Sequence, residues 1–127
     1  MEAITLINEL NQITQQNMNA AQRFRQLTDE ELNRREHTGS WSILECIEHL
    51  NRYGDFYLPE IKSRIENTKH QKSETFNSGL LGDYFAKSML PKEKLNKMNT
   101  FKSMNPIGSS LTRSVLDKFI HQQEQLL

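Results

Sequence analysis

The side chains of this 127-residue chain best suited to bind a metal belong to its histidines, His37, His49, His70 and His121. Glu45 lies one helical turn before His49, and a carboxylate at that spacing can orient an imidazole. Neutral imidazole binds Zn, Ni or Fe, but a catalytic zinc usually takes three protein ligands. No two of these histidines have the i, i+4 spacing that would place both on one metal. From the residues alone, His49 is therefore either a metal ligand or a histidine at the margin of a helical core.

Cys46 is the only cysteine. Its place in the first turn of a predicted helix would lower the pKa of the thiol through the helix dipole. The same position pairs it with Trp41 as a hydrophobic staple, which predicts a side chain that points toward the core. We therefore expect a packed thiol rather than a nucleophile. The sequence has no Gly-rich phosphate loop, Ser-His-Asp set or Cys-x-x-Cys pair, so those classes of site have no support.

The candidate residues lie on a predicted helix that begins at Ser42. Ser42 and Glu45 form a capping box, in which the hydroxyl and the carboxylate each satisfy a free backbone N–H. Gly54 and Pro59 interrupt the apolar pattern, but the pattern keeps its phase, so we predict a kinked helix over residues 42–68. Glu48 is expected to be a solvated charge. The buried face is predicted to consist of Ile43, Ile47 and Leu50, continued by Tyr53, Tyr57, Ile61 and Ile65.

The pattern Trp-Ser-x-x-Glu-x-x-x-His-Leu, formed by Trp41, Ser42, Glu45, His49 and Leu50, resembles the first signature of the DinB/YfiT-like superfamily. Members of that superfamily are four-helix bundles, and many bind a divalent metal through three histidines. The resemblance implies that His49 is the first metal ligand and that Glu45 supports it from the outer shell. The other two ligands usually form a His-x-x-x-His pair on a late helix. This sequence has no such pair.

Two further long helices are predicted, one on each side of the central helix along the chain. The first covers residues 3–27, and a short acidic turn follows it. Residues 70–110 are irregular and are predicted as a crossover that carries a short helix over residues 80–90. The last helix is expected to begin at Ser109 or Ser110. The inner faces of these two long helices are expected to contain Ile7, Leu10, Thr14, Met18, Ala21 and Phe24, and Leu111, Val115, Phe119 and Leu126.

These elements predict an all-α fold with one DinB-like domain over residues 1–127. The expected architecture is an up-down helical bundle of three long helices plus the crossover and its short helix. The fourth helix of the family bundle, which the resemblance implies would carry the histidine pair, is absent from this chain. We therefore expect the domain to be incomplete at its C-terminus, either as a fragment of a longer protein or as a shortened family member.

Charge and hydropathy narrow the classes of partner. Sixteen basic and sixteen acidic residues give a formal net charge of zero, which argues against nucleic acid and anionic membranes as partners. Lysines between residues 87 and 102 form a basic stretch that is expected to be a solvated loop. No run is long and apolar enough to span a bilayer, and the N-terminus does not resemble a signal peptide. With a single cysteine, these features predict a cytoplasmic location.

Two functions from different classes follow. The resemblance implies a divalent-metal-dependent enzyme of the hydrolase or thiol S-transferase type, which acts on a small-molecule substrate and can use a thiol cosubstrate. The alternative is a non-catalytic helical interaction module. In that case the missing helix leaves an apolar groove, which the chain covers by self-association as a homodimer. One histidine on the bundle interior favours the module, and three favour the enzyme.

Overall fold

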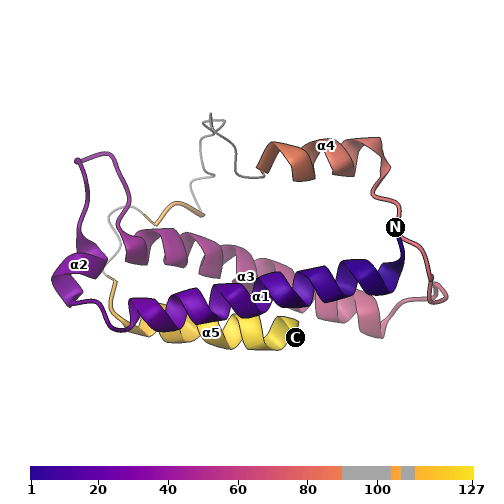
Figure 1. The fold of residues 1–127 in the computed structure, drawn as a ribbon, viewed down its shortest axis with the longest axis horizontal. Helices are drawn as coiled ribbons and strands as arrows, with labels where there is room; N and C mark the ends of the chain where they lie inside the picture. Colours follow the sequence, from indigo (N-terminus) through magenta and orange to yellow (C-terminus); the bar gives the residue numbers. More distant parts are fainter. Residues whose placement is uncertain (90–103, 107–110) are drawn as a thin grey trace.

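Three long helices form the body of the molecule (Figure 1). The computed structural model describes residues 1–89, 104–106 and 111–127. The helices of this part of the chain are α1 (Ala3–Phe24), α2 (Asp29–Asn33), α3 (Ile43–Glu66), α4 (Gly79–Met89) and α5 (Ser114–Leu126). No strand occurs among the described residues, and the prediction of an all-α bundle with a short helix in the crossover is confirmed.

Helix α5 joins the body together. It packs against both α1 and α3, whereas α1 and α3 have little contact with each other. Figure 1 shows that α3 and α5 run in the same direction and that α1 runs opposite to both. Two parallel helices need a long connection that returns the chain to the end where the first one began. The segment between α3 and α5 is that crossover.

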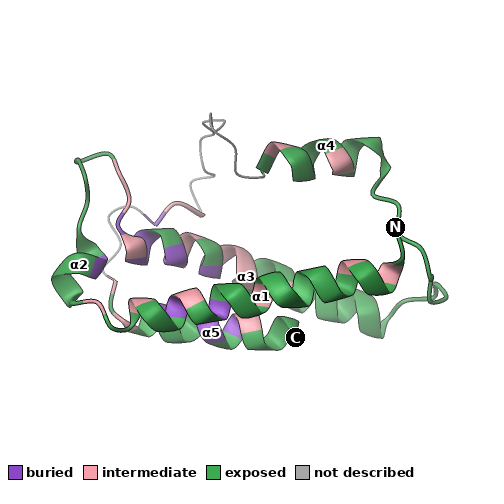
Figure 2. Ribbon diagram, in the orientation of Figure 1, coloured by how far each residue is buried: buried purple, intermediate pink, exposed green. Residues whose placement is uncertain are grey.

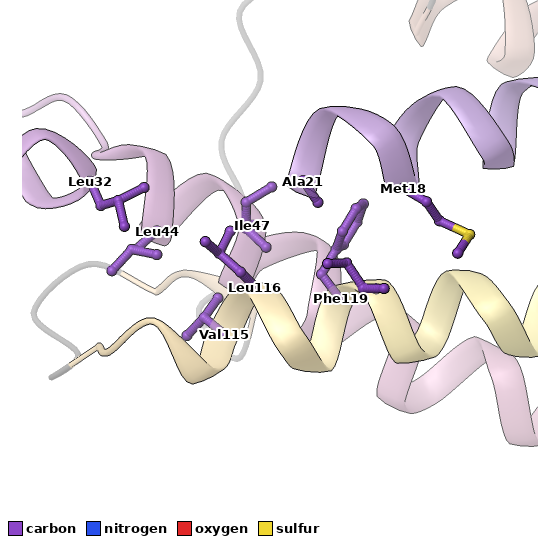
Figure 3. Packing of buried hydrophobic residues seen from close by; sticks show 9 residues of the cluster. Met18, Ala21, Leu32, Leu44, Ile47, Val115, Leu116 and Phe119 are labelled. Carbon is purple, nitrogen blue, oxygen red and sulfur yellow. The ribbon is translucent and has the colours of Figure 1, made fainter. Parts of the chain in front are cut away.

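The core lies at the end of the body where α2 covers the start of α3 (Figure 2). Leu32, Leu44 and Leu116 are almost fully buried and come from three different helices (Figure 3). Burial of each leucine side chain is worth about 2 kcal/mol, so α2 is held largely by Leu32 and by its own capping box. Among the described residues, the core cluster consists of Met18, Ala21, Leu32, Leu44, Ile47, Val115, Leu116, Phe119 and Ile120.

The other end of the body lacks this cover. Helix α5 has 13 residues, against 22 in α1 and 24 in α3, so it is roughly 15 Å shorter at 1.5 Å per residue. Ile7 and Leu10 were expected on the inner face of α1, but both are exposed because α5 does not extend that far. Leu126, expected on the inner face of α5, is also exposed. The other large apolar side chains exposed on α1 and on the later turns of α3 are Ile4, Ile13, Phe56, Tyr57, Ile61 and Ile65.

The helix boundaries differ from prediction by more than two residues at two places. Helix α1 ends at Phe24, because the chain tightens there into a turn in which Leu27 N donates to Phe24 O at 3.0 Å. Helix α5 begins at Ser114 rather than at Ser109 or Ser110, two residues that lie outside the described part of the chain. The N-cap residue of α5, Arg113, makes no side-chain capping hydrogen bond. Pro59 lies inside α3, as predicted.

The buried face of α3 is rotated from the predicted one. Ile47 is buried as expected, but Leu50 is exposed and Ile43 is only half-buried. Leu44 and Asn51 are buried in their place. The side-chain amide of Asn51 donates to Val115 O at 3.0 Å, so a polar contact with α5 helps to fix the rotation of α3.

Helix α4 stands apart from the body (Figure 1) and contributes no buried residue. Its large apolar side chains are exposed, with Leu80 at 96% of its full accessible area. No fourth long helix covers the body within residues 1–89, 104–106 and 111–127.

Candidate functional site

The first turn of α3 is fixed by the predicted capping box. Ser42 N donates to the Glu45 carboxylate at 3.0 Å, and Glu45 N donates to Ser42 Oγ at 3.2 Å. Arg35 adds a bidentate ion pair with the same carboxylate, from Nε at 2.8 Å and from Nη2 at 2.6 Å. Burial raises the pKa of Glu45, but the hydrogen bonds from Arg35 and Ser42 outweigh it and leave the pKa lowered. The Glu45 side chain is therefore an ionised anchor for the loop that precedes α3.

Sequence reasoning missed Arg35. The only available signal was that a buried carboxylate needs a cation, and the chain offers several arginines near Glu45. Which arginine reaches it depends on the path of the loop between α2 and α3, and the sequence does not specify that path.

His49 is half-buried on α3 and lies between two aromatic rings. The Trp41 ring centroid is 5.0 Å from the imidazole, and the Tyr53 ring meets it edge-on at 4.9 Å. The expected pairing of Trp41 with an inward-pointing Cys46 is wrong, because Cys46 is exposed. Trp41 instead packs on the histidine of its own motif.

The Nδ1 atom of His49 lies 2.9 Å from the backbone oxygen of Met104. A carbonyl oxygen only accepts hydrogen bonds, so Nδ1 carries the proton in this contact. In the neutral ring the lone pair then resides on Nε2. A backbone carbonyl bound to one nitrogen is the usual arrangement for an imidazole whose other nitrogen binds a metal or accepts a proton.

Arg52 holds the residue that follows Met104. Its Nη1 donates to Asn105 O at 2.7 Å, and its Nε approaches Glu48 at 3.3 Å. Glu48 is therefore a half-buried partner of Arg52, and the expectation of a solvated charge is corrected. Pro106, the next residue, is fully buried. Helix α3 thus binds two consecutive residues of the crossover, and the residue after them is buried.

The remaining histidines do not join His49. His37 is exposed in the loop before α3, where its Nδ1 accepts from Gly39 N at 3.2 Å. His70 is exposed beyond the end of α3, and His121 is exposed on α5 beside Glu124. Within the described residues, no group of three or more His, Cys, Asp and Glu side chains is placed to hold a metal ion.

The Cys46 thiol has a raised pKa. Partial desolvation by neighbouring atoms is the larger cause, and the negative charge of Glu45 adds to it. Both effects oppose the helix dipole, which was expected to lower the pKa. The thiol is exposed but has little thiolate at neutral pH, a condition that disfavours a nucleophile.

An apolar groove of about 480 Å³ lies between α1 and α3 and is also lined by residues of α5. Its size is in the range of sites that take small molecules or side chains of a partner. Its described lining contains no charged side chain. The groove is lined by Asn17, Ala20, Ala21, Phe24, Ile47, Leu50, Tyr53, Gly54, Tyr57, Leu58, Ile61, Phe119, Gln122, Gln123 and Leu126.

The structure defines a helical bundle in which a Trp-Ser-x-x-Glu-x-x-x-His signature opens a long helix and its histidine is held by a crossover carbonyl. The sequence profile of the DinB superfamily matches residues 12–127. The chain belongs to the DinB superfamily. Comparisons with curated proteins and with solved structures gave no significant match. Among the described helices, none is long and apolar enough to cross a membrane.

Proposed function

We propose that this chain binds a divalent metal through Nε2 of His49 and acts on a small-molecule substrate, as a hydrolase or a thiol S-transferase. The observation that carries the proposal is the contact between His49 Nδ1 and Met104 O, because it leaves the lone pair on Nε2. Glu45 supports the site indirectly, since its pairs with Arg35 and Ser42 fix the first turn of α3, one turn before His49. A bound divalent metal would lower the pKa of a coordinated water or thiol.

The residues of one chain fit one ligand position rather than a complete site. His49 has the required chemistry, but no other histidine of the four lies with it, and no metal-binding group forms within the described residues. The remaining ligands would have to come from a second copy of the chain or from the substrate. The proposal is therefore a site that depends on assembly.

Metal stoichiometry tests this proposal directly. The purified chain is dialysed to equilibrium against Zn²⁺ or Ni²⁺, together with His49→Ala and the matched control His121→Ala, which removes an exposed imidazole from α5. We expect one metal per chain, or one per two chains if a site is shared, with loss in His49→Ala and retention in the control. Absence of metal in the wild type, or equal binding by His49→Ala, would overturn the proposal.

A second candidate is a non-catalytic module that self-associates through the groove between α1 and α3. The specific observation is the groove together with the apolar side chains left exposed beyond α5, among them Ile61 and Ile65. Patches of this kind on a monomer usually meet a partner. The partner proposed is a second copy, because a formal net charge of zero gives two copies no long-range repulsion. A two-fold contact would also bring like apolar faces together.

Sedimentation over a concentration series tests the module. Ile61→Glu places a charge in the groove, whereas the control Leu80→Glu places the same charge on α4, away from the groove. We expect a wild-type dimer whose dissociation constant rises at least about tenfold in Ile61→Glu and is unchanged in the control. A wild type that stays monomeric at high concentration would exclude self-association, and so would equal weakening by both variants.

A further inference from the structure

We propose that Arg52 and the segment 104–106 together form the positioning element of His49, and that they hold its imidazole as the Nδ1–H tautomer before any metal or substrate arrives. The importance of this element for metal binding rests on the proposed function. The tautomer itself does not, because it follows from contacts within the chain.

Two side chains of α3 bind two consecutive carbonyl groups of the crossover. Met104 O accepts from His49 Nδ1 at 2.9 Å, and Asn105 O accepts from Arg52 Nη1 at 2.7 Å. His49 and Arg52 are three residues apart on a helix, so their side chains project from the same face. One face of α3 therefore binds the carbonyl groups of two consecutive residues of the segment.

Pro106 and Glu48 restrain the segment and the arginine that binds it. Pro106 is fully buried, and its ring fixes its own φ angle, so this end of the segment has little conformational freedom. Arg52 is itself oriented by Glu48, one turn earlier on α3, at 3.3 Å. An arginine with several donors in a fixed plane can hold a carboxylate and a carbonyl at the same time.

Two aromatic side chains restrict the imidazole ring of His49. Trp41 packs on it at 5.0 Å and Tyr53 meets it edge-on at 4.9 Å. A ring flip that exchanged Nδ1 with the opposite edge would break the contact with Met104 O. The structure thus supplies an orienting hydrogen bond and two aromatic walls, the combination that preorganises a functional side chain.

Side-chain ¹⁵N–¹H correlation spectra of the metal-free chain measure the tautomer of His49 directly. They are recorded at alkaline pH, where ordinary histidines are neutral. We expect the His49 signals to show Nδ1–H as the major tautomer. A hydrogen bond of usual net strength, about 1 kcal/mol, changes the ratio of the Nδ1–H tautomer to the Nε2–H tautomer roughly fivefold. In Arg52→Ala the hydrogen bond from Arg52 to the Asn105 carbonyl is lost. The ratio of Nδ1–H to Nε2–H tautomer at His49 should then fall toward that of the exposed His121, which serves as an internal reference.

Arg64→Ala is the matched control, since Arg64 lies on the same helix but is exposed and far along the chain from the segment. It should leave the His49 tautomer unchanged. If Arg52→Ala loses its helical circular dichroism signal, Pro106→Ala loosens the same segment from the other end and should change the tautomer ratio in the same direction. A wild type with Nε2–H as the major tautomer would overturn the inference. An unchanged tautomer in the folded Arg52 or Pro106 variant would do the same.

The tautomer spectra and the metal stoichiometry test the positioning element and the proposed function separately. A chain that shows the Nδ1–H tautomer but binds no metal would retain the positioning element and lose the metal proposal. A chain that binds metal through His49 with the opposite tautomer in its metal-free state would do the reverse.

Discussion

Gly54 lies in the middle of α3, where alanine would ordinarily be preferred, and the structure explains why glycine is there. A Cβ atom added at Gly54 would lie 2.0 Å from Oε1 and 2.6 Å from Cδ of Gln122 on α5. Gln122 is buried, and its Nε2 donates to Asn51 O at 3.2 Å and to Asp55 Oδ1 at 3.0 Å. We therefore predict that Gly54→Ala destabilises the fold despite its better helix propensity.

Two opposing effects determine how much Gly54→Ala changes the free energy of unfolding. Alanine in place of glycine within a helix contributes about 1 kcal/mol of stability. The methyl group must displace the Gln122 side chain and break both of its hydrogen bonds, which costs about 2–3 kcal/mol when the loss of fit is included. The net prediction is a loss of about 1–2 kcal/mol in the free energy of unfolding.

Urea unfolding followed by circular dichroism measures the effect. With a slope of about 2 kcal/mol per molar, the midpoint of Gly54→Ala should fall by roughly 0.5–1 M. In the Gln122→Ala background the same change should stabilise by about 1 kcal/mol, because the space is then free. Gly82→Ala on α4, where an added Cβ meets nothing within 4 Å, is the control and should not lower the midpoint. Equal stabilisation by Gly54→Ala in both backgrounds would refute the reasoning.

Three further predictions concern the core and the start of α3. Leu116→Ala should cost about 2–5 kcal/mol in a urea titration, because Leu116 is fully buried, whereas Leu80→Ala at an exposed site should be close to neutral. The rate of Cys46 alkylation should reach half its maximum above the ordinary thiol value of 9.0, since the pKa is raised; a midpoint below that value would contradict the cause assigned. Arg35→Ala should cost about 1–2 kcal/mol at neutral pH. The lowered pKa of Glu45 gives stability that is present above 4.5 and is lost as the pH falls through the folded value. The difference between Arg35→Ala and wild type should therefore shrink below pH 4.5, and a constant difference would refute the ion pair.

The sequence predicted the features that depend on neighbours along the chain. The capping box of Ser42 and Glu45 needs only residues three apart, and it is present with both hydrogen bonds. The short helix in the crossover was placed within one residue, since its apolar spacing and the following proline are local signals. Local signals were also enough to recognise the superfamily, which the profile match confirms.

The rotation of α3 could not be predicted in the same way. Its apolar residues at positions 43, 47 and 50 form an acceptable stripe, and periodicity gives no reason to turn the helix so that Asn51 faces inward. The side-chain amide of Asn51 donates to Val115 O on α5, 64 residues later in the chain, and Gln122 Nε2, 71 residues later, donates to the backbone oxygen of Asn51. A buried side-chain N–H group needs such an acceptor, and a single sequence does not reveal which carbonyl will meet it.

The same limit applies to the candidate site. His49 was identified from its motif, but the group that determines its chemistry is the backbone oxygen of Met104, 55 residues away. A backbone carbonyl has no residue type that a pattern could detect. Asn51 faces α5 while His49 and Arg52 face the crossover, so the contact that fixes the rotation of α3 also decides what the histidine can reach. The core and the candidate site are therefore coupled through one helix, and a change that turns α3 in its packing should alter the tautomer of His49 even when it touches no residue of the site.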